Sequence, residues 1–525
     1  MRSTFMGLEA AKSGLFTQQS ALYTTGHNIS NANTEGYSRQ RVNMQATPGF
    51  PTAGLNSPQF PGHMGTGVEA GAIQRVRDQF IDRQFRQETS KLGYWETKTQ
   101  SISQMEDIMT EPSEYGIAKA FTEFWKTMED VVANPKDTAA RQVMISKGEA
   151  LAESFNYMDM QLKQIQGNIG NEIAVETKEV NSILKQIAEI NKQIMAVEPN
   201  GYVPNDLYDA RDVLVDQLNE LLPVSIERVP SGGNANEVAE GSLTVKFIPA
   251  GGTANDAITL VRGKEYAAIS TLDSDGNPVD GNPDNADTDG YLPFAALSIT
   301  NIGEPPTEGD EAASIAYENF EMSKGKILSL INAYGHGDPA APSGIYPEML
   351  ANLDRLAATF VEQFNLAHQD GYTLATATEG SVAGEEMFFG TTAKEFKVVD
   401  GFRPIDIAAS DAEGEEGNNK NIMALAKLQA TVQDDLNGSS FDSYYQSLIG
   451  DLGVQGQESI RMEYNAATLK LTIENNRASM SSVSLDEEMS NLITFQQAYN
   501  ANARMITVVD ETLDKIINGM GRVGL

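Results

Sequence analysis

Near its C-terminus the chain reads LDEEMSNLITFQQAYNANARMITVVDETL over residues 485–513, with an apolar side chain at every seventh position. This stripe consists of Leu485, Leu492, Tyr499, Ile506 and Leu513. We take the second seam position to lie four residues after each of these, beginning with Met489. A period of seven keeps one stripe of an α-helix facing a partner helix. The stretch therefore predicts a long helix packed in a coiled-coil-like manner.

The same period occurs near the N-terminus. The stripe there consists of Leu8, Leu15, Leu22 and Ile29. Some seam positions of the two terminal stripes are polar, namely Gln18, Gln496 and Asp510. A polar seam lowers the stability of an isolated helix pair while it constrains the register. We therefore expect terminal helices that are poorly ordered alone and become ordered on assembly.

A third stripe lies in the middle of the chain, within residues 173–197. It is apolar at both seam positions, which are occupied by Ile173, Val180, Ile187 and Ile194 and by Ile183, Ile190 and Val197. This pattern predicts a helix that is stable once paired and that ends near Pro199.

After Pro223 the apolar residues begin to alternate with polar ones, as in the segment SLTVKFI at residues 242–248. Alternation with a period of two is typical of β-strands, and glycine-rich and asparagine-rich turns punctuate the stretch. We therefore expect a compact, mainly antiparallel β domain over residues 224–316, inserted into a helical frame.

Together these patterns predict an α+β multidomain fold with an elongated helical, coiled-coil-like frame built from both termini. Such a fold brings both ends of the chain to one end of a long molecule. The expected parts are an axial helix and signature loop (1–70), helical frame (71–223), β domain (224–316), further frame (317–370), a loop and β excursion (371–420) and a C-terminal frame with its axial helix (421–525). Breaks in the last part are expected near Gly438 and at residues 450–453.

Composition excludes several classes of function. The 525 residues include 38 basic and 73 acidic side chains, and the formal net charge is −35. This charge argues against a sequence-independent grip on nucleic acid and against docking to an anionic membrane surface. Cysteine is absent, which excludes disulfides, thiol nucleophiles and cysteine-ligated metal sites. We find no apolar core of a secretory signal near the start and no apolar run long enough to span a membrane.

No residue constellation points to an enzyme or to a cofactor. The four histidines, His27, His63, His336 and His368, lack the spacing of a metal site, so we interpret them as surface or packing residues. The chain contains neither a nucleophile elbow nor a phosphate-binding loop. The segment at 65–71 reads GTGVEAG and is interpreted as a turn that leads into a strand.

The acidic stretch 273–290 is the best candidate for a metal site. Asp273, Asp275 and Asn277 have the first spacings of a calcium-binding loop, and so do Asp280, Asn282 and Asp284. Both runs lack the central glycine and the final glutamate of such a loop. A solvated turn is therefore favoured, and we assign no metal ligand.

Two segments carry a specific resemblance. Residues 25–42 read TGHNISNANTEGYSRQRV, and their pattern around Asn31, Asn33, Gly36 and Tyr37 resembles the N-terminal signature of flagellar rod, hook and hook-associated proteins. Residues 483–506 resemble the C-terminal signature of the same axial family. The internal segments LYDARD at 207–212 and NLAHQDG at 365–371 are similar to features of its hook-associated members.

The resemblance implies a non-enzymatic junction subunit that joins the flagellar hook to the filament by helical packing of its terminal helices. It implies contacts with further copies in a ring, with hook protein and with the second junction protein, hook-associated protein 3. It also implies export through the flagellar channel to the cell exterior without a cleaved signal peptide, with a cytoplasmic chaperone on the C-terminal helix. No cofactor, nucleic acid or membrane partner is expected.

The candidate assembly residues combine the two stripes with the signature loop. They are Leu8, Leu15, Leu22, Ile29, Asn31, Asn33, Gly36, Tyr37, Leu485, Met489, Leu492, Tyr499, Ile506 and Leu513. An ordinary intramolecular core is the alternative explanation of the stripes. The alternative function is a secreted adhesin-like module whose β domain binds calcium or another ligand.

Overall fold

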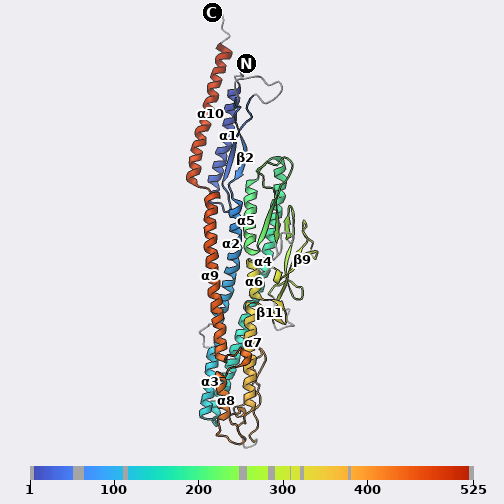
Figure 1. Cartoon of the computed structure of the whole chain (residues 1–525), viewed down its shortest axis with the longest axis vertical. Coiled ribbons are helices and arrows are strands. Elements are labelled where there is room, and N and C mark those ends of the chain that lie inside the picture. Colours follow the sequence, from blue (N-terminus) through green and yellow to red (C-terminus); the bar gives the residue numbers. More distant parts are fainter. Residues whose placement is uncertain are drawn as a thin grey trace.

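A computed structural model of the chain describes residues 5–50, 64–109, 116–247, 257–281, 290–307, 309–319, 324–375 and 380–519. The molecule is elongated, and both termini lie at the same end, as the sequence predicts (Figure 1). Long helices run along its axis, and the sheets lie at one side. The α+β fold with a helical frame is therefore confirmed.

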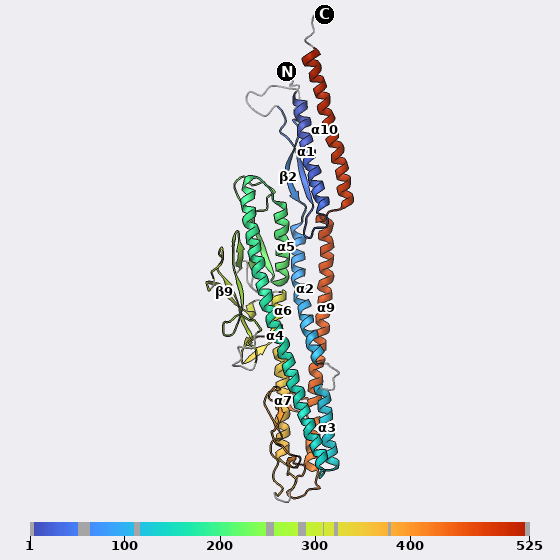
Figure 2. The same ribbon diagram turned by 180° about the vertical axis from the view of Figure 1, so that it is seen from behind.

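One end of the molecule is formed by the two terminal helices. Helix α1 (Phe5–Ser30) lies alongside α10 (Leu485–Gly519) in both views (Figure 1 and Figure 2). A hairpin of β1 (Gln40–Ala46) and β2 (Val68–Arg75) packs on α1. Gly67, just before this second strand, has a φ of 132°. We call α1, α10 and this hairpin the terminal module.

The shaft below the terminal module is a set of packed helices. In it α2 (Gln79–Met109) packs against α9 (Phe441–Ser481), and the long helix α4 (Thr138–Val197) packs against its neighbours α3 (Ile117–Ala133), α5 (Asn205–Leu221), α6 (Lys326–Tyr334) and α7 (Ile345–Gln369). Helix α8 (Lys420–Lys427) contacts α3 and α7. Short 3-10 helices are η1 (Glu198–Asn200), η4 (Tyr317–Asn319), η5 (Pro404–Asp406), η6 (Leu428–Ala430) and η7 (Asp434–Leu436).

The first seam position of the α4 stripe is buried, and so is Ile183 of the second, whereas Ile190 and Val197 are half-buried. The residues at the first seam position have no exposed area; they are Ile173, Val180, Ile187 and Ile194. The helix ends at Val197, just before Pro199. Because every seam position in this part of α4 is apolar, its burial contributes on the order of 2 kcal/mol for each large side chain.

The C-terminal helices differ from the prediction at one point. Helix α9 runs without a break through Gly450 and Gly453, so the break expected there is wrong. A glycine inside a helix costs only about 1 kcal/mol relative to alanine, and packing against α2 outweighs that cost. The break near Gly438 is present, where Asn437 and Gly438 both have positive φ. A second break, at residues 482–484, separates α9 from α10.

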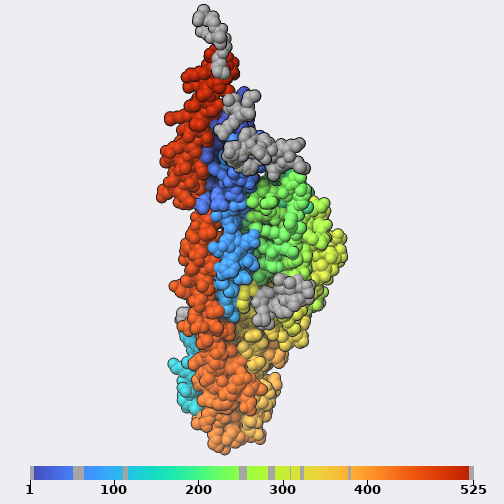
Figure 3. Space-filling view, turned by 45° about the horizontal axis from the view of Figure 1, so that its top comes forward, coloured from blue at the N-terminus to red at the C-terminus, as the bar shows by residue number. Residues whose placement is uncertain are grey.

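The inserted region forms two small sheets beside α4, and in the space-filling view it makes a bulge at one side of the shaft (Figure 3). The first sheet is antiparallel and contains β3 (Val224–Val229), β4 (Ser242–Phe247), β5 (Ile258–Arg262) and β6 (Glu265–Tyr266). The second contains β7 (Ile269–Asp273), β8 (Phe294–Thr300), β9 (Glu311–Ala316), β10 (His336–Asp338) and β11 (Ala341–Ser343). Strands β10 and β11 lie beyond residue 316, and β10 pairs in parallel with β8.

Two asparagines of α4 hold the sheets in place. The side chain of Asn191 exchanges two hydrogen bonds with the backbone of Leu243 in β4, at 2.9 Å each. Asn181 does the same with the backbone of Ile269 in β7, at 2.8 and 2.7 Å. Each side chain thus satisfies one donor and one acceptor of a strand and fixes that strand relative to the helix.

At the far end of the shaft, aromatic side chains form a dense core around α7. The predicted apolar face of α7 is buried there, including Leu353, Leu356, Phe360 and Phe364, with Leu350 half-buried. Phe360 contacts the rings of Phe121, Phe124 and Phe388 with centroids 5.2–5.9 Å apart. In the described part of the excursion at 371–420, the strands are β12 (Phe388–Phe389) and β13 (Lys397–Val398), and η5 follows them.

His368, at the end of α7, is fully buried. Its Nε2 accepts a hydrogen bond from the backbone N–H of Ala408 at 2.9 Å, so Nδ1 carries the proton and donates to the carbonyl of Glu385 at 2.6 Å. Burial lowers the pKa of His368 to about 4. The neutral form is therefore the one that fits the fold, which agrees with a packing role.

We predict that His368 makes the fold sensitive to mild acid. Because its pKa is lower in the folded chain than in the unfolded chain, its contribution is complete above about pH 6.5 and is lost as the pH falls towards 4. The loss should reach about 3 kcal/mol, measured by urea unfolding across this range. His368→Gln should flatten the dependence, and an unchanged slope in that variant would assign the acid sensitivity to other groups.

The acidic stretch forms a turn at its beginning. One carboxylate oxygen of Asp273 accepts hydrogen bonds from the backbone N–H groups of Asp275 and Asn277, at 2.9 and 2.8 Å. Asn282, Asp284 and His63 lie outside the described residues. Among the residues that the structure describes, no three histidine, aspartate or glutamate side chains are grouped to hold a metal ion. Nor does any described helix combine the length and the apolar character needed to cross a membrane.

Candidate functional site

The terminal helices meet through small side chains. The buried residues of α1 are Ala11, Gly14, Thr17, Ala21, Thr24, Thr25 and Asn28. A Cβ atom at Gly14 would lie 3.0 Å from Nδ2 of Asn502, and one at Gly7 would lie 3.9 Å from a methyl group of Val509. The absence of a side chain at Gly14 therefore lets α10 approach α1 closely, whereas at Gly7 a Cβ atom would make an ordinary contact.

The predicted stripes divide between two faces. Leu492, Tyr499, Ile506 and Leu513 are half-buried and lie on the same side of α10 as Asn502, whereas Leu485 and Met489 are each 50% exposed. The second seam position lies three residues after the stripe, at Glu488, Phe495, Asn502 and Val509, and not four. On α1 the stripe of Leu8, Leu15, Leu22 and Ile29 is half-buried and flanks the contact. Small residues of α1 set this register, and the apolar pattern of α10 alone does not contain it.

Both terminal helices expose apolar side chains on their outer faces. On α1 these are Phe5, Phe16 and Tyr23, which are 55–75% exposed. On α10 they include Leu485, Met489, Ile493, Met505, Val508, Ile516 and Ile517. Large, exposed apolar side chains gathered on one element mark interaction surfaces. In Figure 3, α10 lies along the edge of the molecule at its terminal end.

Asn28, in the last turn of α1, is the centre of the signature loop. It is 1% exposed and makes four hydrogen bonds. Its Nδ2 donates to the carbonyl of Gln40 at 2.9 Å and to a carboxylate oxygen of Glu488 at 3.1 Å. Its Oδ1 accepts from the Tyr37 hydroxyl at 2.8 Å and from the backbone N–H of Gln40 at 3.0 Å. The end of α1, the signature loop and the start of α10 therefore meet at one side chain.

Other signature residues support this arrangement. The Tyr37 hydroxyl also contacts Nδ1 of His27 at 2.9 Å, and burial, with Asp206 nearby, raises the pKa of Tyr37. Asn31 is bonded only locally, to the His27 carbonyl and to Thr34, and Asn33 is exposed.

The linker between α9 and α10 is held by Arg39. Its guanidinium pairs with Glu487 at 2.6 Å, and its backbone N–H donates to the Ser481 carbonyl at 2.8 Å. These bonds attach both ends of the linker to the chain segment that follows the signature loop.

The segment LYDARD at 207–212 lies against the signature loop. The backbone N–H of Ser38 donates to Asp209 at 3.1 Å, and Arg75 pairs with the other oxygen of this carboxylate at 2.7 Å. Asn205, which precedes the segment, donates to the Gln40 side chain and to the Ile73 carbonyl. The resemblance in the sequence points to both segments, but only the fold shows that they are in contact.

A buried network of ion pairs joins the hairpin to the shaft. Its centre is Asp212, with Arg77 at 2.6 Å, Arg75 at 2.9 Å and Arg86 at 3.3 Å. Burial alone would raise the pKa of Asp212, but the surrounding guanidinium groups outweigh burial and hold this pKa far below its usual value. Loss of any member of such a network destabilises the fold, because an unpaired buried charge remains.

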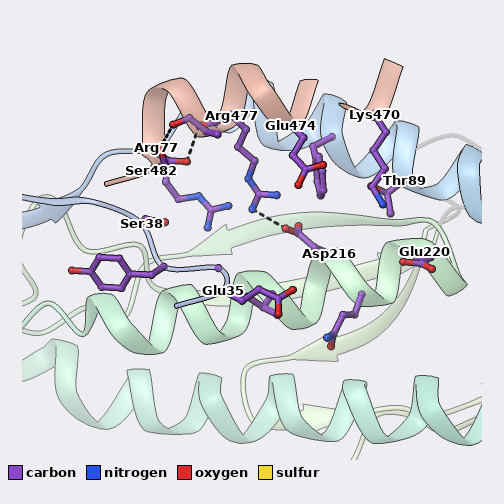
Figure 4. Close-up of a pocket in the computed structure, with 17 residues that line it drawn as sticks. Glu35, Ser38, Arg77, Thr89, Asp216, Glu220, Lys470, Glu474, Arg477 and Ser482 are labelled. Carbon is purple, nitrogen blue, oxygen red and sulfur yellow. Dashed lines mark hydrogen bonds and ion pairs between the residues drawn. The ribbon is translucent and has the colours of Figure 1, made fainter. Parts of the chain in front are cut away.

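Helix α9 enters the same network through Arg477. Its guanidinium pairs with Asp82 of α2 at 3.0 Å and with Asp216 of α5 at 2.7 Å, and the second pair is drawn in Figure 4. The guanidinium also lies over the ring of Phe85, 4.6 Å from its centroid. Three helices of the shaft are thus fixed to one another just below the terminal module. We call this network, together with the Asn28 contacts, the joint.

A cleft of about 320 Å³ opens beside the joint, between the signature loop and α2, α5 and α9 (Figure 4). Glu35, Ser38, Arg77 and Asp216 line it. Gly36 closes one side, with a φ of 75°, and a Cβ atom there would lie 2.1 Å from a methyl group of Val213. Only glycine fits this position. The charged groups of the joint pair with one another. The joint is therefore a structural connection between parts of the chain.

Sequence reasoning missed the most connected residues of the joint. Asn28 stands inside the quoted signature, but the predicted assembly residues there are Asn31 and Asn33. Glu488 stands among three consecutive acidic residues, where nothing marks one of them as buried. The alternation of basic and acidic residues at Arg75, Arg77 and 209–216 was the available signal, because buried charges occur in pairs.

The chain has full-length relatives. A family model described as the flagellar hook-associated protein FlgK helical domain matches residues 102–388. Models of the flagella basal body rod protein and of the flagellar basal body rod FlgEFG protein C-terminal match residues 8–37 and 475–519. Flagellar hook-associated protein 1 of Bacillus subtilis is 38% identical, over 99% of both chains. The Escherichia coli protein of that name is 28% identical, over 97% of this chain and 98% of its own.

The structural comparison agrees on the fold. The flagellar hook junction protein FlgK from Burkholderia pseudomallei is similar with a TM-score of 0.56, at 14% identity, and the match covers 76% of this chain and all of that one. Together with the matches at both signature regions, these findings confirm the resemblance seen in the sequence. The chain belongs to the flagellar hook-associated protein 1 (FlgK) family, whose members are structural components of the flagellum.

Proposed function

We propose that this chain is the structural subunit that joins the flagellar hook to the filament, and that its terminal helices do so by packing between subunits. The observation that carries this proposal is the exposed apolar surface of the terminal module. Tyr23 on α1 and Ile493 on α10 point away from the contact between the two helices, and both are more than half exposed. Their burial in an assembly supplies a driving force of roughly 25 cal/mol for each Å².

The distribution of charge also favours the terminal module as the surface where copies meet. The chain carries −35 overall, so copies repel one another along most of their length. Helix α1, by contrast, contains one acidic and one basic residue, Glu9 and Lys12, besides His27. Between Met489 and Val509, α10 contains a single charged residue, Arg504. The terminal module is therefore where association costs least electrostatically.

The partners we propose are further copies of the chain in a ring, hook protein on one side and hook-associated protein 3 on the other. A cytoplasmic export chaperone would cover the apolar outer face of α10 before export. The chain would then reach the cell exterior through the flagellar export channel without a cleaved signal peptide. We further propose that it has no catalytic activity, because its relatives are structural flagellar proteins.

Electron microscopy of cells that lack this protein tests the proposed function. We predict hooks without filaments, with flagellin released into the medium, because these cells lack the surface on which we propose that the filament starts. The full chain supplied from a plasmid should restore filaments. Normal filaments in cells without the protein would contradict the proposed junction role.

A further inference from the structure

Glu488 has an unusual position in α10. It is the one buried residue among the described residues of this helix, and it is 3% exposed. Taking a carboxylate out of water is costly unless it is paired or hydrogen-bonded. The side chain that bonds to Glu488 is the neutral amide of Asn28, at 3.1 Å, while the neighbouring Glu487 is exposed and pairs with Arg39. A buried acid in the first turn of an otherwise exposed helix indicates a specific positional role.

The Asn28 amide can donate to Glu488 only when the folded signature loop fixes its plane. Its Oδ1 is occupied by Tyr37 and by the backbone N–H of Gln40, and one Nδ2 hydrogen is occupied by the Gln40 carbonyl. These three bonds fix the plane of the amide, so its remaining hydrogen points to where Glu488 lies when α10 is docked. The folded signature loop therefore prepares a donor for the first turn of α10.

We propose that Asn28 and Glu488 form a clamp that couples the docking of α10 on α1 to the folded signature loop, and thereby to the shaft. Both are positioning residues. In the absence of the prepared donor, burial of Glu488 is unfavourable, and α10 docks less often. Arg39 assists by holding the linker at Ser481 and Glu487, so the clamp acts at the first turn of α10, from which the remaining turns follow along α1.

The clamp acts within a single chain, so it does not depend on the junction role. A disulfide test is available because the chain has no cysteine. Gly7 and Val509 face each other across the contact, and a Cβ atom at Gly7 would make only an ordinary contact, so Gly7→Cys with Val509→Cys in the full chain will form a disulfide only when α10 is docked. The rate of its formation under a fixed oxidant, followed by mass spectrometry, measures docking. The pair Gly7→Cys with Val508→Cys is the mismatched reference, because Val508 is 52% exposed on the outer face.

We expect Asn28→Ala to slow disulfide formation at least tenfold. The matched control is Asn31→Ala, the same change in the same signature, which removes only local bonds to His27 and Thr34 and should alter the rate less than twofold. Glu488→Ala, which removes the other half of the clamp, should reproduce the slowing, whereas Glu487→Ala should have a smaller effect.

Three results would overturn the clamp. The first is a parent pair that reacts no faster than the mismatched reference. The second is an Asn28→Ala variant as fast as the Asn31→Ala variant. The third is slowing by Asn28→Ala without slowing by Glu488→Ala, which would assign the effect to a misfolded end of α1. None of these results bears on whether the chain joins hooks to filaments, so the two proposals fail separately.

Discussion

Replacing Asp212 by alanine should lower the free energy of unfolding of the shaft by about 3–5 kcal/mol. The change removes the one carboxylate that lies within 3.3 Å of Arg75, Arg77 and Arg86. All three guanidinium groups are enclosed, with side chains at most 7% exposed, so they would keep their charge without its central partner. Urea unfolding followed by circular dichroism at neutral pH measures the loss.

The matched control is Asp411→Ala. Asp411 also pairs with a basic residue, Lys420 at 3.2 Å, but both side chains are exposed to solvent. Exposed ion pairs contribute little, because water screens them, so this variant should unfold at the same urea concentration as the parent chain. Equal loss in the two variants would show that burial of the network does not matter to the fold.

The effect of Asp212→Ala should also depend on pH. The pKa of Asp212 is depressed in the folded chain, so its contribution is present above the unfolded value of about 3.9 and is lost as the pH falls further. The difference between parent and variant should therefore shrink below about pH 4. A difference that stays constant down to pH 2 would contradict the assignment of a charged Asp212.

The sequence predicts the helical frame well where the apolar pattern of a single segment determines which of its faces is buried. Ile173, Val180, Ile187 and Ile194 repeat with a helical period and have no exposed area, so their pattern alone identifies the buried face. Strand β4 occupies residues 242–247, but its polar residues Ser242 and Thr244 are buried together with the apolar ones, so the alternation predicts the strand and not its buried face. In α4 the periodicity of apolar residues and the observed burial have the same cause, which is the removal of apolar surface from water.

The joint could not be predicted in the same way. Its residues lie far apart in the sequence, at Asn28, Arg75, Asp212, Arg477 and Glu488, and each is polar. Burial of a polar residue depends on the partner that the fold supplies, and nothing in one segment states that partner. The register predicted for α10 differs from the observed one for a related reason. Glycine and alanine on α1 decide which side of α10 is covered. The apolar stripe of α10 does not show this side, because it also continues onto the outer face.

The second large effect concerns the end of the chain. A chain that stops after Ser484 lacks α10, and we expect its shaft and sheets to keep their fold. The large hydrophobic core extends from Tyr94 to Leu452 and includes no residue of α1 or α10. The truncated chain should therefore unfold cooperatively near the urea concentration of the full chain. Loss of the shaft transition would mean that α10 contributes to the core.

Joining of hook and filament, in contrast, should be abolished, because the truncated chain lacks the outer face of α10 and leaves the contact face of α1 uncovered. A full-length control variant, Ile493→Asp with Val508→Asp, separates loss of the surface from loss of the helix. Both side chains are more than half exposed, so this variant should fold as the parent does and yet fail to join hooks to filaments.

The most direct measurement is electron microscopy of cells that produce the chain ending at Ser484 in place of the full chain, together with detection of that chain in the medium. We predict bare hooks, with both the truncated chain and flagellin outside the cells. Filaments attached to the hooks of these cells would contradict the central claim that the terminal helices join hook to filament.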